Sequence, residues 1–410
     1  MKPDSKADKG SISDQIVQFV CEFEGTAIPD DARHVMRLSL VDWVAVAVAG
    51  RNEPVARILQ KIGKDEGGTP EAFVVGCSHR LPARMTAKIN GTLSHALDYD
   101  DTHFDSMGHT SVAVIPAALS LADKMSIEPK AFLEAALMGV ELAVRIGTWL
   151  GRSHYHAGFH MTATAGTFGA AMASARILCL SSEQTRHALG IAASMASGIK
   201  TQFGSMGKPL HAGLAAHAGV DAALLARDGF VSTHDGLEGE QGFSLTHHGA
   251  GDTGAFDGLG DDFVFERVSH KFHACCHGIH AALEALAILR EKYSVQPEEI
   301  AELVITVNPQ YLNVCNITSP VTGLEAKFSY RLVAAMFMHG HDTARIETYN
   351  DMICQDKDVL RLRDLVIVAT DAGLSDAAAM VDLKLASGDQ HSQSFNLTDP
   401  MSLPAREARV

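Results

Sequence analysis

Residues 158–171 read GFHMTATAGTFGAA, and this stretch, with others like it, decides the fold. Alanine and glycine make up half of it. Alanine has the highest helix propensity, and small side chains let two helices pack at close range. The stretch therefore predicts a helix over 161–178 that lies in close contact with other helices.

Helical periodicity continues on both sides of this stretch, up to about residue 248. Over 12–24, for example, apolar residues recur at the spacing of one helix face, and Ser11 is a suitable N-terminal cap. The segment Ser181-Ser-Glu-Gln184 has the residues of a capping box. We expect helices over 12–24, 29–49, 55–64, 82–98, 112–124, 129–150, 161–178, 182–197 and 210–227.

The pattern changes at residues 249–262, GAGDTGAFDGLGDD, which we interpret as a loop at a domain boundary. Its glycines match G-x-G-x-x-G, but His247 and His248 precede it instead of an apolar strand, so a dinucleotide site is rejected. Helices are expected over 277–292 and 328–338, with strands of an antiparallel sheet over 301–308, 365–370 and 380–385. The sequence thus predicts a mainly α protein: a large all-helical domain over 1–250, joined by the tail 389–410, and a smaller α+β domain over 262–388.

Composition narrows the classes of function. The chain has 410 residues, of which 46% are apolar and 20% charged, as expected of a folded protein of two domains. With 34 basic and 49 acidic side chains its net charge is -15, which disfavours nucleic acid as a partner. It contains no long apolar segment, so no membrane association is expected. Seven cysteines, an odd number at irregular spacing, favour a reducing compartment, and we predict a cytoplasmic protein.

Histidine is unevenly distributed, since 18 of the 21 histidines precede residue 281. No C-x-x-C pair exists, and the adjacent Cys275 and Cys276 make an awkward chelate for one tetrahedral ion. We therefore predict no metal and no other cofactor. A divalent ion held by the aspartates near residue 100 stays open as an alternative, although their spacing matches no known metal loop.

The densest polar cluster is HALDYDDTH over 95–103, followed by His109. If the helix over 82–98 continues, His95, Asp98 and Thr102 share one face, and Asp100 points elsewhere. Such a face offers a carboxylate and a hydroxyl beside an imidazole, which is a plausible acid–base set. The alternative is a helix end followed by a solvated acidic loop.

Three more clusters lie at expected helix ends. His160 comes directly before a helix, where backbone N–H groups favour an anion, or where it simply caps the helix. Lys208 precedes another helix, a poor place for a cation unless an anion such as a substrate carboxylate binds there; a surface lysine is the alternative. The third cluster runs from Lys271 to His280, in which the cysteines are expected to be packed. Together the clusters favour a pocket built from loops over a helical scaffold.

Several of these segments, in this order, resemble the MmgE/PrpD family. The resemblance covers roughly residues 10–390 and is carried by HALDYDDTH (95–103), GFHMTATAGTFGAA (158–171), LGIAASMASG (189–198), KPLHAGLAAHAG (208–219), LEGEQGF (237–243) and KFHACCHGIHAALEAL (271–286). It implies a large helical domain, a smaller α+β domain, a homodimer, and cofactor-free chemistry on small di- or tricarboxylates.

The resemblance also implies the site. Its catalytic residues would be His109, His160, Asp98 and Thr102, and its substrate-binding residues Lys208, Lys271, Cys276 and His277. Cys276 stands where decarboxylases of the family have a catalytic histidine, and Leu332 where relatives have a tyrosine.

The predicted function is that of a cofactor-independent hydro-lyase acting on a hydroxy-polycarboxylate such as 2-methylcitrate. The lysines would hold carboxylates, His109 and His160 would exchange protons, Asp98 would orient a histidine, and Thr102 would bind an oxygen. An epimerase or isomerase and a cis-aconitate-type decarboxylase are the alternatives with related chemistry. A carboxylate-binding protein without activity is the alternative of another class.

Overall fold

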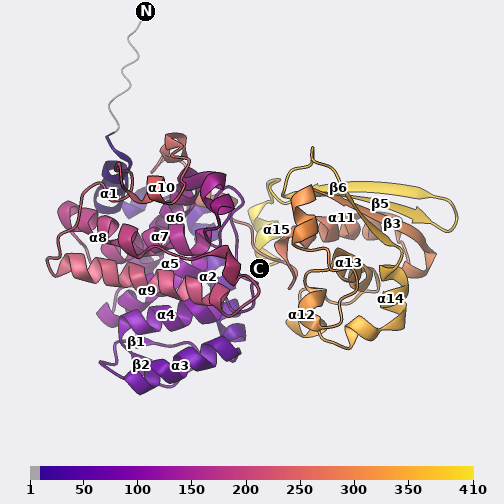
Figure 1. Cartoon of the computed structure of the whole chain (residues 1–410), viewed down its shortest axis with the longest axis horizontal. Helices are drawn as coiled ribbons and strands as arrows, with labels where there is room; N and C mark the ends of the chain where they lie inside the picture. The colour runs from indigo at the N-terminus through magenta and orange to yellow at the C-terminus, as the bar shows by residue number, and fades with distance from the viewer. Residues whose placement is uncertain (1–9) are drawn as a thin grey trace, which may run out of the picture. The chain divides into compact units, whose positions relative to one another are not determined.

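A computed structural model describes residues 10–410, and these form two units. The first unit contains residues up to His270, together with 403–408 and Val410, and the second contains Lys271–Ser402 and Arg409 (Figure 1). The first is almost entirely helical and the second combines helices with a sheet, so the predicted fold class is confirmed. No helix among residues 10–410 is both long and apolar enough to cross a membrane.

Helices build the first unit, with one short hairpin among them. Ser181 forms the capping box that the sequence predicts, with Gln184 as the third helical residue, and the predicted cap Ser11 also forms a capping box, with Asp14. The elements are α1 (Ile12–Glu22), α2 (Asp30–Gly50), α3 (Pro54–Glu66), β1 (Ala72–Phe73), β2 (Arg80–Leu81), α4 (Ala83–Ser94), α5 (Ser111–Met125), α6 (Pro129–Ala157), α7 (Met161–Ile177), α8 (Ser182–Met195), α9 (Gly207–Arg227), α10 (Phe243–Thr246) and α15 (Leu403–Glu407).

Helix α7, which carries most of the stretch GFHMTATAGTFGAA, lies at the centre of this unit. It packs against α5, α6, α8 and α9, and all its residues except Arg176 are buried. A Cβ atom added to Gly169 would lie 2.5 Å from the backbone oxygen of Gly139 on α6, and one added to Gly219 on α9 would lie 2.4 Å from the Cβ of Ala170. The helices therefore approach one another at distances that only small residues permit.

The second unit is built around a four-stranded sheet in the order β4-β3-β5-β6. Helix α11 packs against β5 and β6, and α13 packs against β4 and α11. The elements are α11 (His277–Tyr293), β3 (Ile300–Val307), α12 (Gly323–Ala326), α13 (Tyr330–Met338), α14 (Lys357–Arg363), β4 (Val366–Thr370), β5 (Ala378–Leu385) and β6 (Gln390–Asn396).

Two features of this sheet differ from the sequence-based expectation. The sheet is mixed, because β3 and β4 run parallel while the other neighbours are antiparallel. The long helical connection between β3 and β4 allows this parallel pairing. Strand β6 lies in the tail 389–410, which the sequence assigned to the helical domain without a secondary structure, but residues up to Ser402 belong to the second unit. The strand gave no clear signal because its residues are mostly polar and it forms an edge of the sheet.

Candidate active site

The polar cluster near residue 100 lies in a loop and not on a helix. Helix α4 ends at Ser94, and His95 is its C-terminal cap. The expectation that His95, Asp98 and Thr102 share a helix face is therefore wrong. Asp98 adopts a left-handed backbone conformation, with φ at 52°, which aspartate tolerates better than most residues and which turns the chain away from the helix path.

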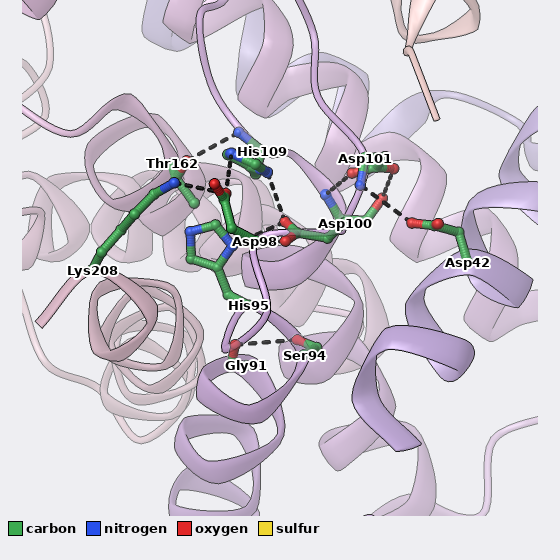
Figure 2. A network of polar contacts seen from close by, with 11 residues as sticks. Asp42, Gly91, Ser94, His95, Asp98, Asp100, Asp101, His109, Thr162 and Lys208 are labelled. Carbon is green, nitrogen blue, oxygen red and sulfur yellow. Dashed lines mark hydrogen bonds and ion pairs between the residues drawn. The ribbon is translucent and has the colours of Figure 1, made fainter. Parts of the chain in front are cut away.

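Asp100 is the centre of the cluster, contrary to the expectation that it points elsewhere. Its fully buried carboxylate lies 2.8 Å from Nδ1 of His95 and 2.8 Å from Nδ1 of His109 (Figure 2). Although burial alone would raise its pKa, the two imidazoles hold the pKa of Asp100 well below its ordinary value. An ionised carboxylate only accepts hydrogen bonds, so His95 donates to it from Nδ1, while Nδ1 of His109 faces it as an ion-pair contact.

Asp98 joins the other side of this cluster to α9. Its Oδ1 lies 2.7 Å from Nζ of Lys208 and 3.4 Å from Nε2 of His109 (Figure 2). Helix α9 begins at Gly207, earlier than predicted, so Lys208 is in its first turn. A cation is unfavourable there because of the helix dipole, and the Asp98 carboxylate compensates for this.

His109 and His160 are both neutral at pH 7. Burial lowers the pKa of His109 to about 4, although Asp100 acts in the opposite direction. Burial also places the pKa of His160 well below its ordinary value, and nearby histidines and Lys208 add to the effect. A neutral imidazole can accept a proton, and a bound anion would make that protonation easier.

His160, the N-terminal cap of α7, extends the cluster. Its Nδ1 lies 3.1 Å from Nδ1 of His211 on α9, and the edge of its ring faces Phe203 at a centroid distance of 4.9 Å. The ring of His95 is 4.6 Å from the ring of His109 and 6.0 Å from that of His160. The ring of His95 therefore lies close to the rings of both His109 and His160.

The other predicted site residues are Thr102, in the first unit, and Lys271, Cys276 and His277, in the second unit. Thr102 belongs to the first unit, where its backbone pairs with that of Ser269 through hydrogen bonds of 2.9 and 2.8 Å. Lys271, Cys276 and His277 belong to the second unit: Lys271 is buried, Cys276 caps α11 and His277 is its first residue. The structure thus gathers Asp98, His109, His160 and Lys208 in the first unit and the other substrate-binding residues in the second.

Sequence reasoning missed Asp100 and His211 and gave His95 a secondary role. A signal for His211 was present, because it follows Lys208 by three residues and so lies on the same helix face. No pattern in the sequence indicated the role of Asp100, because that role depends on how the loop after α4 folds back.

Four of these residues could in principle hold a metal ion. His95, Asp98, Asp100 and His109 each offer one ligand atom, and these atoms lie within 4.8 Å of one another. However, the ammonium group of Lys208 already neutralises Asp98, and Asp100 already lies 2.8 Å from Nδ1 of each of two imidazoles. This charge balance fits an acid–base cluster better than a metal centre, and the absence of a metal stays a prediction.

Models of one protein family match most of the chain. The MmgE/PrpD N-terminal domain matches residues 14–253 and the MmgE/PrpD C-terminal domain matches residues 273–387. The chain belongs to the MmgE/PrpD family, as its sequence motifs predict.

Several proteins of named activity are similar to this chain over about 70% of its length. The chain is 31% identical over 318 residues to the cis-aconitate decarboxylase of Homo sapiens, an alignment that covers 73% of this chain and 65% of the relative. It is 28% identical over 302 residues to the cis-aconitate decarboxylase-like protein oryM of Aspergillus oryzae, covering 70% and 63%. It is 29% identical over 311 residues to the cis-aconitate decarboxylase of Mus musculus, covering 72% and 63%. The matched part is less than two thirds of each relative's length.

A buried histidine at the end of the first unit makes stability depend on pH. Nε2 of His270 lies 3.0 Å from Oγ of Ser39 on α2, and burial lowers the pKa of His270 to about 3. In the unfolded chain this imidazole has its ordinary pKa of about 6.5, so it binds a proton there first. The free energy of unfolding should therefore fall as the pH falls below 6.5, by about 3 kcal/mol from this group by pH 4.

Urea unfolding at pH 7.5 and pH 4.5 measures this effect. His270→Asn should lose less stability between the two pH values than the wild type does, because the acid-sensitive group is gone. His156→Asn, which changes an exposed histidine, is the matched control and should behave as the wild type. An equal pH dependence in His270→Asn and wild type would show that His270 does not contribute.

Proposed function

We propose that this protein is a cofactor-independent lyase that acts on a small tricarboxylate by moving a proton at the carbon beside a carboxylate. One observation carries the proposal: a buried carboxylate orients two imidazoles next to a lysine ammonium group. The family membership supports the same class of substrate. The catalytic role of Thr102, the substrate-binding roles of Lys271, Cys276 and His277, and the homodimer belong to this proposal as well.

The first step is substrate binding. Lys208 exchanges its ion pair with Asp98 for one with a substrate carboxylate, so a fixed cation comes to lie beside the reacting carbon. Negative charge that develops at that carbon and its carboxylate is stabilised most by such a charge in a pocket that excludes water. Asp98, released from Lys208, then faces Nε2 of His109 and favours its protonated form.

Dehydration is the reaction that this geometry supports best. One imidazole removes the proton from the carbon beside the carboxylate, and the electron pair stays on the substrate. The hydroxyl group on the next carbon then leaves with a proton from a second imidazole, so that an alkene and water are formed. Elimination needs both a base and an acid, and His109 and His160 supply two separate imidazoles. A hydroxy-tricarboxylate such as 2-methylcitrate fits this requirement.

Decarboxylation is the second candidate, and the printed names of the curated relatives favour it. Here a carbon–carbon bond breaks, carbon dioxide leaves, and the electron pair that remains on the substrate carbon takes a proton from an imidazolium. This reaction needs one acid, which His109 beside Asp98 and Asp100 can supply. Cis-aconitate is therefore the second substrate to test.

A panel of citrate, 2-methylcitrate and cis-aconitate, incubated with the full chain in H₂O and in D₂O, tests the proposal. Proton NMR detects an alkene from dehydration, deuterium in an otherwise unchanged skeleton from epimerisation, and the decarboxylated product together with carbon dioxide. We expect turnover of one tricarboxylate, its loss in His109→Gln, and its retention in the surface variant His156→Gln. Thermal stabilisation by these acids without any turnover would instead identify a carboxylate-binding protein.

A further inference from the structure

His160 and His211 face each other through the same ring nitrogen. Their Nδ1 atoms are 3.1 Å apart, and the two residues are 2% and 8% exposed. A hydrogen bond of this length needs one donor and one acceptor, so a single proton lies between the two nitrogens. The two neutral rings must therefore be in opposite tautomers: the one with its proton on Nδ1 has a lone pair on Nε2, and the other has its proton on Nε2.

The loop after α8 holds this pair together. The backbone N–H of His160 donates to the carbonyl oxygen of Gly198 over 2.9 Å. Gly198 has φ at +142°, and a Cβ atom there would lie 2.7 Å from the Cβ of Ala163 and 3.4 Å from Nδ1 of His211. A glycine at this position lets the loop reach both histidines, because a side chain would press against Ala163 and the ring of His211.

The surroundings of the pair leave its proton free to move. Among residues 10–410 neither imidazole pairs with a carboxylate, and the titratable groups that face His160 are His95, His109 and Lys208, besides His211 itself. This contrasts with His109, whose tautomer is set by the ionised Asp100. The tautomer of His160 is instead set by its neutral partner, which can either donate or accept.

We propose that His211 is a positioning residue that sets the tautomer of His160 and passes protons between His160 and solvent. The inference rests on the proposed function, in which His160 exchanges a proton with the substrate. His211 is suited to this task because it is more exposed than His160 and its Nδ1 is hydrogen-bonded to Nδ1 of His160.

The proton transfers balance without any further reactant. Nε2 of His160 takes the proton from the substrate carbon, and the electron pair of the C–H bond stays on the substrate. The proton on Nδ1 of His160 then moves to Nδ1 of His211, which releases its own Nε2 proton to water. His160 is left neutral with a proton on Nε2, and the acid for the leaving hydroxyl group is the second imidazole, His109.

The shared proton can be tested without any substrate. In the full chain with ¹⁵N-labelled histidine, NMR should show one downfield imidazole proton that is coupled to two imidazole nitrogens. This signal should be absent from His211→Leu and from His160→Gln. Separate N–H signals for the two rings, each unaffected by loss of the other, would overturn the pairing. This measurement stands even if no tricarboxylate is turned over.

The transfer of protons is tested with His211→Asn on whichever of 2-methylcitrate and cis-aconitate the wild type turns over. The asparagine amide can still hydrogen-bond to Nδ1 of His160, but it cannot pass a proton onward. We expect kcat to fall at least tenfold with KM within about twofold, in the range of acid–base contributions. Added imidazole should restore kcat to His211→Asn and leave Lys208→Met inactive.

The matched control is His217→Asn, which changes another histidine of α9, one that contacts the Arg84 carbonyl oxygen. His217→Asn should keep the kcat of the wild type. His211→Asn, Lys208→Met and His217→Asn should all unfold at the same urea concentration as the wild type. An unchanged kcat in His211→Asn, or a loss that imidazole does not restore, would falsify the transfer. If the wild type turns over neither acid, the proposed function is wrong while the NMR result still decides the pairing.

Discussion

Asp100→Asn should lower kcat/KM by about three to four orders of magnitude while leaving the protein folded. The carboxylate accepts an N–H from His95 and lies 2.8 Å from Nδ1 of His109, so its negative charge faces Nδ1 of both rings. The asparagine amide can donate as well as accept, so at least one ring can turn its lone pair towards residue 100 and present the wrong nitrogen to the substrate. In an enzyme where a buried aspartate orients a histidine, the same change costs about 10⁴ in kcat.

Steady-state kinetics on the acid that the substrate panel identifies measures this loss. Asp105→Asn is the matched control, because it makes the same substitution in the same loop at an exposed residue. It should retain the activity of the wild type. A kcat/KM within tenfold of wild type in Asp100→Asn would mean that neither His95 nor His109 needs this carboxylate for catalysis.

Arg145→Met should destabilise the first unit by about 3–5 kcal/mol, the usual cost of leaving one partner of a buried ion pair alone. Arg145 on α6 is 1% exposed, and its Nε lies 2.6 Å from Glu141, which is fully buried. The guanidinium group also donates to the carbonyl oxygens of Ala255, Asp257 and Asp262, while Glu141 accepts from the N–H groups of Val264 and Phe265. Its removal leaves the buried carboxylate without its cation, and it leaves several carbonyl oxygens without the donors that Arg145 supplies.

Denaturant unfolding followed by circular dichroism gives this free energy. The double variant Arg145→Met/Glu141→Leu should recover part of the loss, since no buried charge is then left alone. Lys61→Met serves as the surface control: it breaks the exposed pair with Asp65 on α3 and should leave the free energy of unfolding nearly unchanged. A loss in Arg145→Met no larger than in Lys61→Met would contradict the structural role of the buried pair.

The Arg145 network also explains why composition misjudged residues 249–262. Glycine and aspartate in this segment predicted a boundary loop, yet the division into units falls between His270 and Lys271. The segment belongs to the first unit because its backbone carbonyls accept hydrogen bonds from a buried arginine more than a hundred residues earlier. No local pattern reveals such a contact.

The helices could be predicted because their signals are local. Apolar spacing, capping residues such as Ser11 and Ser181, and alanine content act within a few residues of one another, and the structure confirms the helices that they predict. The ends of the helices were predicted less accurately. Helix α4, for example, stops at Ser94 although the helical spacing of the sequence continues to Asp98. The left-handed conformation of Asp98 lies in the loop that follows, and it brings the carboxylate to Lys208 and His109.

By itself, the sequence determined the helical scaffold, the class of small anionic substrate expected from its motifs, and most of the polar residues that gather in the first unit. Only the tertiary structure decided how those residues pair. Asp100 lies between two histidines, and His160 shares a proton with His211, because a loop, a helix cap and the first turns of α9 meet in space. Hydrogen-bond partners that are between five and about fifty residues apart depend on the packing of several helices at once, and periodicity along one helix carries no information about that packing.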